Sequence, residues 1–417
     1  MKFRKLGIIE PIAKVIDEKG FDAPTEIQEK SIPLVTQGRD IIAGSATGSG
    51  KTLAFAAGIL KNTNNTGKIQ ALVLTPTREL AEQVSRELER FSKYKNLATT
   101  TVYGGVSINP QIHKLQKTDI VVGTPGRILD HLERRTLDLR QVKTLVLDEA
   151  DRMLDMGFID DVEKIIRSCS RERQTLLFSA TIYPEIAGLA KRYMNNPVKV
   201  SAEKYVDPSK LKQVYYDIKD NLKFSLLVHL LKHEQQGLVM VFSNTRRNVD
   251  FIAKNLKLNG IDSLPIHGGF SQAKRTNVMK HFHSGRAFVL VCTDVAARGL
   301  DIPHVSHIYN YDIPKDAKEY VHRIGRTARA GKEGKVINLL AGRDHENFDR
   351  VLRENRIKIE KEEIPRIGKA VIKRTERRRQ GNRFGSRGFG RKNSRNRNFS
   401  RNKGTKNRRD GAWPNIK

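Results

Sequence analysis

The chain has 417 residues, a hydrophobic content of 38% and a formal net charge of +31 at pH 7. That length predicts two or three folded domains, and no apolar run reaches the roughly 18 residues that a membrane-spanning helix needs. So large an excess of positive charge favours a polyanionic partner, and nucleic acid is preferred over the alternative of an anionic membrane surface.

Residues 1–200 alternate short apolar runs with segments of helix length. We predict buried strands at Asp40–Ser45, Ala71–Thr75, Asp119–Thr124, Thr144–Asp148 and Thr175–Ser179, with helices such as Arg78–Phe91 between them. This alternation is typical of a parallel sheet covered by helices on both faces. It predicts a first α/β domain over residues 1–204.

Residues 213–365 repeat the alternation and predict a second α/β domain. The predicted strands are Leu238–Phe242, Ser263–Ile266, Val289–Cys292 and Val305–Tyr309, and the predicted helices are Phe224–His233, Thr245–Asn259 and Gln272–His281. Between the domains, the charged stretch Ser201–Lys212 contains Pro208 and predicts a linker over residues 205–212.

The composition changes after about residue 366, where Arg, Asn, Gly and Ser become abundant. Val371–Lys417 holds 17 Lys and Arg against Glu376 and Asp410, a net charge of +15 by subtraction. So few apolar residues cannot offset the chain entropy, and we predict a disordered basic tail over residues 366–417. The alternatives for this tail are nonspecific RNA binding, which we prefer, and a solubilising run of charge.

Three aromatic residues of the tail interleave with Arg and Gly, which suits base stacking combined with phosphate attraction; they are Phe384, Phe389 and Phe399. The role of Trp413 stays open. Cys169 and Cys292 lie in or beside apolar runs without metal-ligand spacing, which favours buried free thiols. With an amino terminus that lacks the apolar core of a secretory signal, these thiols indicate a reducing, cytoplasmic setting. We expect no membrane partner.

A glycine-rich loop follows the first predicted strand and opens a predicted helix; it consists of Ser45, Ala46, Thr47, Gly48, Ser49, Gly50, Lys51 and Thr52. Gly48 and Gly50 let the backbone curl so that its N–H groups face a phosphate, and the helix amino terminus adds positive potential. Lys51 reaches the β- and γ-phosphates, and Thr52 supplies a hydroxyl to Mg²⁺. Ser45 stands where the general pattern has Gly.

An acidic cluster, Asp148-Glu149-Ala150-Asp151, ends another buried strand. Asp148 can hold Mg²⁺ through water, and Glu149 can orient or deprotonate an attacking water. A solvated acidic turn is the alternative, which the phosphate loop in the same domain disfavours. Together the loop and the cluster predict a magnesium-dependent nucleotide hydrolase.

These segments, with others in the same order, resemble the DEAD-box RNA helicase family over about residues 3–330. The resemblance implies two tandem RecA-like parallel-sheet domains that bind ATP and RNA across their cleft. Gly20–Gln28 resembles the Q motif, in which Gln28 would bond both edges of adenine. An upstream aromatic residue, Phe3, would stack on the base. Phe21 is a further residue expected to bind ATP.

The resemblance also assigns residues that couple hydrolysis to duplex opening. Ser179-Ala180-Thr181 resembles the coupling motif, and the residues expected to take part are Asp151, Ser179, Thr181, Arg298 and His322. Thr293–Asp301 resembles motif V, which places Gly299 and Asp301 at the nucleotide. His322–Arg329 resembles motif VI, in which Arg326 and Arg329 would be arginine fingers on the γ-phosphate; ordinary surface charge is the alternative for these two.

Family matches mark an RNA surface at strand ends and helix starts, where free N–H groups can hold phosphates. The candidates are Pro76, Thr77, Arg78, Gly104, Gly105, Thr124, Pro125, Gly126, Arg127, Ser243, Arg246, Gly268, Gln272, Arg275 and Thr293. Such contacts position a backbone and read no sequence, and a preference for RNA over DNA would come from 2′-hydroxyl contacts.

The resemblance implies an ATP-dependent RNA helicase that hydrolyses ATP to ADP and phosphate, closes two domains on RNA and unwinds short duplexes or remodels RNA–protein complexes. An ATP-gated RNA clamp, an annealing chaperone and a DNA-dependent motor are alternatives. Val146–Ile159 and Glu363–Ile367 resemble the bacterial RhlE-type branch, which implies ribosome assembly or RNA turnover. We expect a monomer that acts on rRNA or mRNA with ribosomal-precursor or RNA-decay proteins as possible partners.

Overall fold

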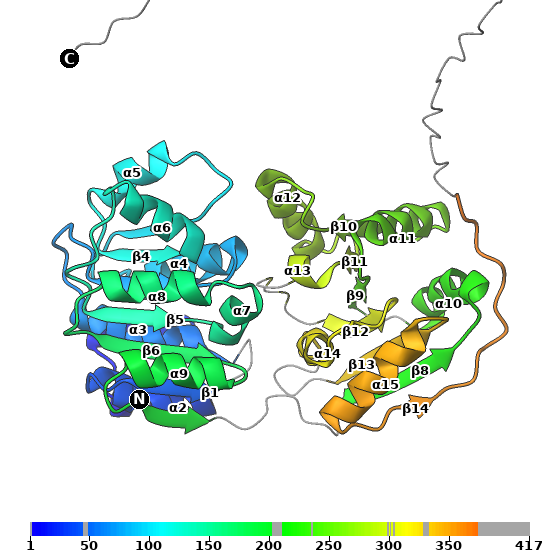
Figure 1. Cartoon of the computed structure of the whole chain (residues 1–417), viewed down its shortest axis with the longest axis horizontal. Coiled ribbons are helices and arrows are strands. Elements are labelled where there is room, and N and C mark those ends of the chain that lie inside the picture. Colours follow the sequence, from blue (N-terminus) through cyan, green and yellow to red (C-terminus); the bar gives the residue numbers. More distant parts are fainter. Residues whose placement is uncertain are drawn as a thin grey trace, which may run out of the picture. The chain divides into compact units, whose positions relative to one another are not determined.

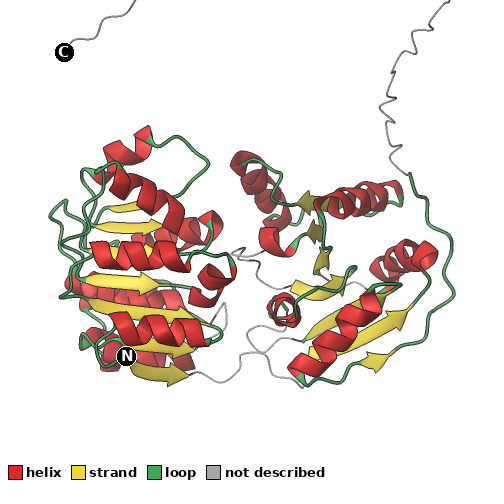
Figure 2. Cartoon of the chain, in the orientation of Figure 1, coloured by secondary structure: helices red, strands yellow, loops and turns green. Residues whose placement is uncertain are grey.

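The computed structural model describes residues 2–44, 49–201, 211–234, 237–297, 300, 302, 305–327 and 333–373. Over these residues the chain forms two lobes, residues 2–201 and 211–373, and each is a seven-stranded sheet flanked by helices (Figures 1 and 2). Every strand pairing in both sheets is parallel. The predicted pair of tandem parallel-sheet domains is therefore confirmed.

The first lobe alternates strands and helices along most of its length. Its helices are η1 (Arg4–Leu6), α1 (Glu10–Glu18), α2 (Glu26–Thr36), α3 (Lys51–Asn62), α4 (Arg78–Phe91), α5 (Asn109–Leu115), α6 (Pro125–Glu133), α7 (Ala150–Asp155), α8 (Ile159–Ser168) and α9 (Pro184–Tyr193). Its strands are β1 (Ile41–Gly44), β2 (Ala71–Leu74), β3 (Thr99–Val102), β4 (Ile120–Gly123), β5 (Thr144–Leu147), β6 (Gln174–Ser179) and β7 (Val198–Ser201).

The second lobe follows the same plan. Its helices are α10 (Asp220–His233), α11 (Arg246–Leu258), α12 (Gln272–His283), α13 (Asp294–Ala297), α14 (Ala317–Ile324) and α15 (Asp344–Asn355). Its strands are β8 (Leu211–Asp217), β9 (Leu238–Phe242), β10 (Ser263–Ile266), β11 (Val289–Cys292), β12 (Val305–Asn310), β13 (Gly334–Leu340) and β14 (Glu360–Lys361).

The two sheets share one strand order. It is β3-β4-β2-β5-β6-β1-β7 in the first lobe and β10-β11-β9-β12-β13-β8-β14 in the second. Numbered from the first strand of each lobe, both read 3-4-2-5-6-1-7. The lobes are therefore two copies of one topology, and residues at equivalent strand ends can be compared directly.

Side chains alternate between the two faces of each sheet and build a separate core on each. On β1, Ile41 and Ala43 pack with α1 to α4, whereas Ile42 packs with the cluster that includes α8 and α9. On β9, Met240 and Val241 divide between two cores in the same way. Helices on both faces bury nearly all residues of these strands, which explains their continuous apolar sequences.

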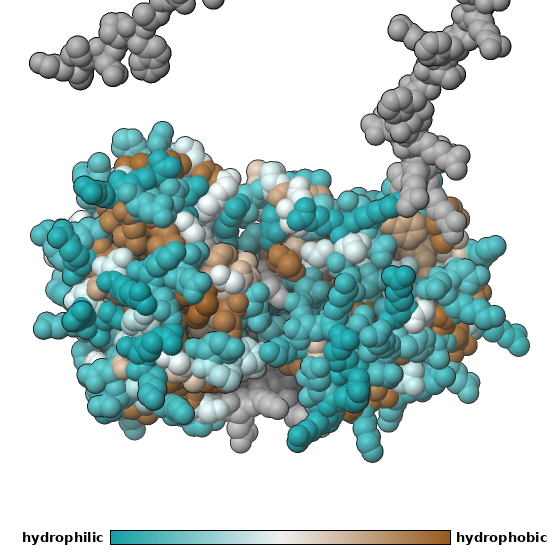
Figure 3. All heavy atoms as spheres, in the orientation of Figure 1, coloured by the Kyte–Doolittle hydropathy of each residue, from teal (hydrophilic) through white to brown (hydrophobic). Residues whose placement is uncertain are grey.

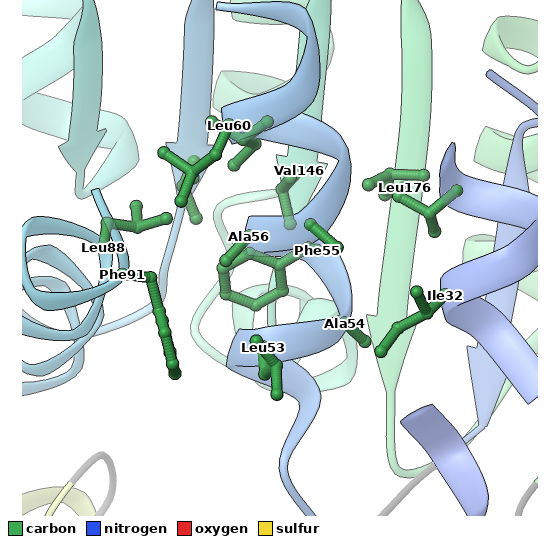
Figure 4. Packing of buried hydrophobic residues seen from close by; sticks show 14 of the residues in the cluster. Ile32, Leu53, Ala54, Phe55, Ala56, Leu60, Leu88, Phe91, Val146 and Leu176 are labelled. Carbon is green, nitrogen blue, oxygen red and sulfur yellow. The ribbon is translucent and has the colours of Figure 1, made fainter. Parts of the chain in front are cut away.

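The core beneath α3 fixes the helix that begins at Lys51 (Figure 4). Phe55 and Phe178 meet edge to face with ring centroids 5.5 Å apart. Figure 4 shows Ile32 of α2 and Leu88 of α4 on opposite sides of α3. Helix α3 is therefore held by both neighbouring helices and by the sheet.

The structure moves two expected domain boundaries. Residues 211 and 212 of the expected linker belong to β8, because Leu211 is buried and pairs with Gly334; residues 205–210 lie outside the described residues. The expected tail began at residue 366, yet Ala370 donates its N–H to Ser225 Oγ at 3.1 Å and Lys373 to Asn255 Oδ1 at 2.7 Å. Residues 374–417 lie outside the described part.

None of the helices over the described residues is long and apolar enough to cross a bilayer. The face shown in Figure 3 is mainly hydrophilic, with separate hydrophobic patches. Cys169 and Cys292 are buried free thiols, as predicted, and burial raises the pKa of both, to about 12 for Cys169.

Gly58 permits the close approach of α3 to α2, and replacing it tests that contact. A Cβ at Gly58 would lie 2.3 Å from Val35 Cγ1. We expect Gly58→Ala to lower the free energy of unfolding by about 1–3 kcal/mol in denaturant titrations, because overpacking outweighs the gain in helix propensity.

The matched control is Gly188→Ala on α9. There the nearest atom to an added Cβ is the flexible tip of Arg192, 3.5 Å away. This change should leave stability unaltered or raise it by up to about 1 kcal/mol. Equal effects of the two substitutions would contradict the tight α2–α3 contact.

Candidate ATP and RNA site

The phosphate loop and the acidic motif meet at the carboxyl edge of the first sheet. Lys51 begins α3 after β1, and Asp148 follows β5. Nζ of Lys51 lies 3.7 Å from Oδ1 of Asp148, and their side chains are 7% and 4% exposed. Burial raises the pKa of Asp148 to about 6, and the nearby Lys51 charge opposes that rise.

Some predicted site residues lie outside the described part of the chain. The nucleotide-binding and arginine-finger candidates among them are Ser45, Ala46, Thr47, Gly48, Gly299, Asp301 and Arg329, and the coupling candidate is Arg298. Of the described remainder, Ser49 is buried and Thr52 is half-buried on the first turn of α3. The helix start that should face the phosphates is thus in place.

Gln28 links the start of α2 to the phosphate loop. Its Oε1 accepts from the Thr25 N–H at 3.0 Å, and its Nε2 donates to the Gly50 carbonyl at 3.0 Å. Thr25 Oγ1 also donates to the Ser49 carbonyl at 2.8 Å. Each contact uses one of the two acceptor sites of Oε1 or one of the two hydrogens of Nε2. The amide therefore keeps one acceptor site and one N–H for the adenine contacts that the resemblance implies.

The two aromatic candidates for adenine stacking lie in different environments. Phe3 is 5% exposed and belongs to the core of the first lobe. Phe21 is 43% exposed, and Lys19 Nζ lies 5.7 Å from its ring centroid. Phe3 thus packs among core side chains while the ring of Phe21 is accessible, and stacking of either ring on adenine stays a prediction.

Asp151 joins the acidic motif to the predicted coupling motif. Its Oδ2 accepts hydrogen bonds from the N–H and Oγ1 of Thr181, at 3.0 and 2.9 Å. Its own N–H donates to Ser179 Oγ at 3.1 Å, and that hydroxyl donates to the Thr181 carbonyl at 2.7 Å. A displacement of Asp151 would therefore be transmitted directly to residues 179–181.

Equivalent arginines stand at the first position of a helix in both lobes. Arg78 begins α4 after β2, and Arg246 begins α11 after β9. The caps are also equivalent, since Thr77 Oγ1 accepts from Leu80 N–H at 3.3 Å and Thr245 Oγ1 from Asn248 N–H at 3.1 Å. Each helix start thus combines oriented N–H groups with a positive side chain.

Glycine pairs make room for these arginines. A Cβ at Gly105 would lie 2.2 Å from Nη1 of Arg78, and Gly105 has a φ of +78°. In the second lobe, a Cβ at Gly268 would lie 3.3 Å from Nη2 of Arg246. Gly104-Gly105 follows β3 and Gly268-Gly269 closely follows β10, so the two arrangements occupy equivalent strand ends.

The remaining RNA candidates differ in exposure. Thr124 stands at the N-cap position of α6 without a side-chain capping hydrogen bond, and Pro125 begins the helix. Arg127 Nη2 donates to the Val106 carbonyl at 3.0 Å. The exposed or half-buried candidates are Arg78, Gly104, Gly105, Thr124, Gly126, Arg127, Arg246, Gly268, Gln272 and Arg275, and the buried ones are Pro76, Thr77, Pro125, Ser243 and Thr293. The buried Ser243 hydroxyl donates its hydrogen bond to Asp312, so in this structure it stabilises the turn after β9 and is not free to donate to RNA.

Comparison with known proteins now bears on this geometry. Residues 25–188 match the family described as DEAD/DEAH box helicase, and residues 222–331 match the helicase conserved C-terminal domain. The DEAD-box ATP-dependent RNA helicase CshA of Geobacillus kaustophilus is 45% identical over 373 residues, which cover 88% of this chain and 80% of that protein. The chain belongs to the DEAD/DEAH box helicase family.

Further relatives agree with this membership. The ATP-dependent RNA helicase CshA of Listeria monocytogenes is 48% identical over 347 residues, covering 82% of this chain and 66% of that protein. The structure of S. cerevisiae Dbp5 bound to RNA and ADP BeF3 has a TM-score of 0.78 at 32% identity, covering 86% of this chain and 95% of that chain. These relatives are named CshA and Dbp5, so the RhlE-type branch stays unconfirmed.

Arg323 is a residue of this DEAD-box helicase that the sequence analysis left without a role. It is 1% exposed, and its Nη2 donates to Asp294 Oδ2 at 2.7 Å and to Asn244 Oδ1 at 3.0 Å. Its Nη1 donates to Asn310 Oδ1 at 2.9 Å. Arg323 therefore joins α14 to α13 and to the loop before α11.

The neighbouring Arg326 is also buried, at 4% exposure, and its Nη1 donates to the Leu300 carbonyl at 2.9 Å. Surface charge, the alternative for Arg326, is thus excluded. The sequence signal that could have marked Arg323 is its permanently charged side chain within His322–Arg329, the segment that resembles motif VI. His322 lines a small hollow with both arginines.

The arginine–diglycine contact in this DEAD-box helicase can be tested at Gly105. Gly105→Ala introduces a Cβ that overlaps the Arg78 guanidinium at a φ that favours glycine. We expect the affinity for a labelled single-stranded RNA, measured by anisotropy with a non-hydrolysable ATP analogue, to fall about 5- to 20-fold because Arg78 is displaced.

Gly104→Ala is the matched control for this measurement. The nearest atom to a Cβ there is Nη2 of Arg78 at 3.8 Å, which is ordinary van der Waals contact. Its RNA affinity should stay within about twofold of the parent protein. Unchanged RNA binding in Gly105→Ala would show that the placement of Arg78 does not matter.

Proposed function

We propose that this DEAD/DEAH box helicase is an ATP-dependent RNA helicase that hydrolyses ATP to ADP and phosphate and locally unwinds short duplexes or remodels RNA–protein complexes. The observation that carries the proposal is that the segment 148–151 contacts Lys51 through Asp148 and Thr181 through Asp151. The relatives named ATP-dependent RNA helicase, and the Dbp5 structure bound to RNA and ADP BeF3, support it.

In the proposed mechanism the first lobe holds the nucleotide. The start of α3 and the Lys51 ammonium stabilise the phosphates, and Glu149 orients the attacking water. Gln28 contacts adenine together with the aromatic residues Phe3 and Phe21. Arg326 and Arg329 of the second lobe would add positive charge at the γ-phosphate once ATP and RNA bring the lobes together. Most of the rate enhancement would be positional and electrostatic.

The residues present fit a magnesium ion. Oδ1 of Asp148 is buried and receives no hydrogen bond from the described residues, so a carboxylate oxygen is available to a cation or its water. Thr52 can add a hydroxyl from the first turn of α3. Mg²⁺ is usually held by one or two carboxylates together with phosphates and water, and it neutralises phosphate charge.

The RNA partner and setting complete the proposal. Contacts from helix starts and glycine turns suit an RNA backbone with little sequence preference. We propose that the protein acts as a cytoplasmic monomer on rRNA or mRNA, in ribosome biogenesis or RNA turnover. We also propose that its function is related to that of RhlE-type and CshA-type helicases. The high positive charge of the chain supports RNA as the partner.

Glu149→Gln tests the catalytic assignment. The amide keeps the size of the side chain but cannot act as a base, so we expect ATP and RNA binding to persist while the RNA-stimulated turnover number falls at least about 100-fold. Glu172→Gln, at an exposed position before β6, is the control and should retain full turnover. Full ATPase activity in Glu149→Gln would refute the proposed role.

The nucleic acid that stimulates hydrolysis tests the substrate. RNA and DNA oligonucleotides of one sequence would be compared in a steady-state ATPase assay. We expect RNA to stimulate at least about tenfold more than DNA, because 2′-hydroxyl contacts distinguish the two. Equal stimulation by DNA would favour the DNA-dependent motor instead.

A further inference from the structure

Arg152 directly follows the acidic motif and has no role in the mechanism above. Because α7 begins at Ala150, Arg152 lies on the first helical turn, three residues after Glu149 and on the same side. Its Nη1 lies 2.8 Å from Oε2 of Glu149, and the two side chains are 5% and 4% exposed. The ion pair is therefore almost completely removed from water.

Four charged side chains at this sheet edge form two pairs. Lys51 lies beside Asp148, and Arg152 lies beside Glu149. A buried carboxylate without a partner is strongly disfavoured, and the partner of Asp148 and of Glu149 is in each case a neighbouring cation. Lys51 is also the residue that must meet the phosphates, which leaves Arg152 as the dedicated partner of Glu149.

The backbone restrains Glu149 as well. Glu149 has φ 54° and ψ 51°, a left-handed conformation that is uncommon for a residue other than glycine. Its carbonyl accepts from the N–H groups of Arg152 and Met153 at 3.0 and 3.1 Å. The Glu149 side chain is thus fixed at its base by this turn and at its tip by the guanidinium.

We propose that Arg152 is a positioning residue for Glu149: it holds one carboxylate oxygen so that the other is presented to the attacking water. The inference rests on the proposed role of Glu149. A planar guanidinium fixes the direction of a carboxylate better than the compact ammonium of lysine does. Misplacing a catalytic group by about 1 Å can cost on the order of 100-fold in rate.

Substitutions at Arg152 separate positioning from nucleotide binding. Arg152→Met removes the charge while filling much of the same space, and Arg152→Lys keeps the charge without the planar fork. We expect Arg152→Met to lower the RNA-stimulated kcat about 10- to 100-fold, with Arg152→Lys between it and the parent protein. The KM for ATP and the Kd of a non-hydrolysable ATP analogue should stay within about twofold.

Two controls make the test specific. Arg90→Met removes the arginine of Glu87–Arg90, an ion pair with the same spacing that lies on the surface of α4, and should leave kcat unchanged. In a Glu149→Gln background, measured by single-turnover hydrolysis over hours, Arg152→Met should cause less than about a threefold further loss. Arg152 then acts through Glu149 alone.

The opposite outcomes overturn the proposal. A higher kcat in Arg152→Met would mean that the ion pair inhibits Glu149 instead of positioning it. If Arg152→Met lowers the rate by the same factor in the Glu149→Gln background as in the parent protein, Arg152 has a general structural role. If Arg152→Met fails to fold, Arg152→Lys decides, and an unchanged kcat there overturns the inference. Full activity in Glu149→Gln would instead remove the proposed function on which the inference rests.

Discussion

Charge buried at the carboxyl edge of the first sheet is the constraint on which the candidate site depends. Lys51, Asp148, Glu149 and Arg152 are all nearly inaccessible to water, and each acid stands beside one base. Such pairs contribute little net stability, because desolvation offsets their attraction. Their value lies in holding charged groups in fixed positions, which a phosphate-binding hydrolytic site requires.

The parallel sheet creates this edge. Strands β1, β5 and β6 end at residues 44, 147 and 179, far apart in the sequence, but they are adjacent in the sheet. The loops that follow them therefore lie close together. Asp151 then reaches Thr181 without any other element between them. The second lobe repeats the strand order, and its equivalent ends carry Arg246 and Gly268 as the first lobe carries Arg78 and Gly105.

Much of the fold was predictable because buried parallel strands are continuous apolar runs bounded by turns. Strands β9, β10 and β11 have the predicted bounds. Strand β3, Thr99–Val102, was not predicted, since it lies at the sheet edge and is half-buried, with threonines in place of an apolar run. Strand β8, Leu211–Asp217, was also not predicted, because its alternating pattern lies next to a charged stretch that suggests a linker.

Sequence alone determined the chemistry that the site can perform, because the phosphate loop, the acidic motif and their flanking strand and helix are local patterns. Only the tertiary structure decided which side chains are free to act. Phe3 is in the core and Phe21 is exposed, Ser243 is held by Asp312, and Arg323 joins three segments far apart in sequence. Burial and long-range hydrogen bonds arise from packing between elements, and no local pattern specifies them.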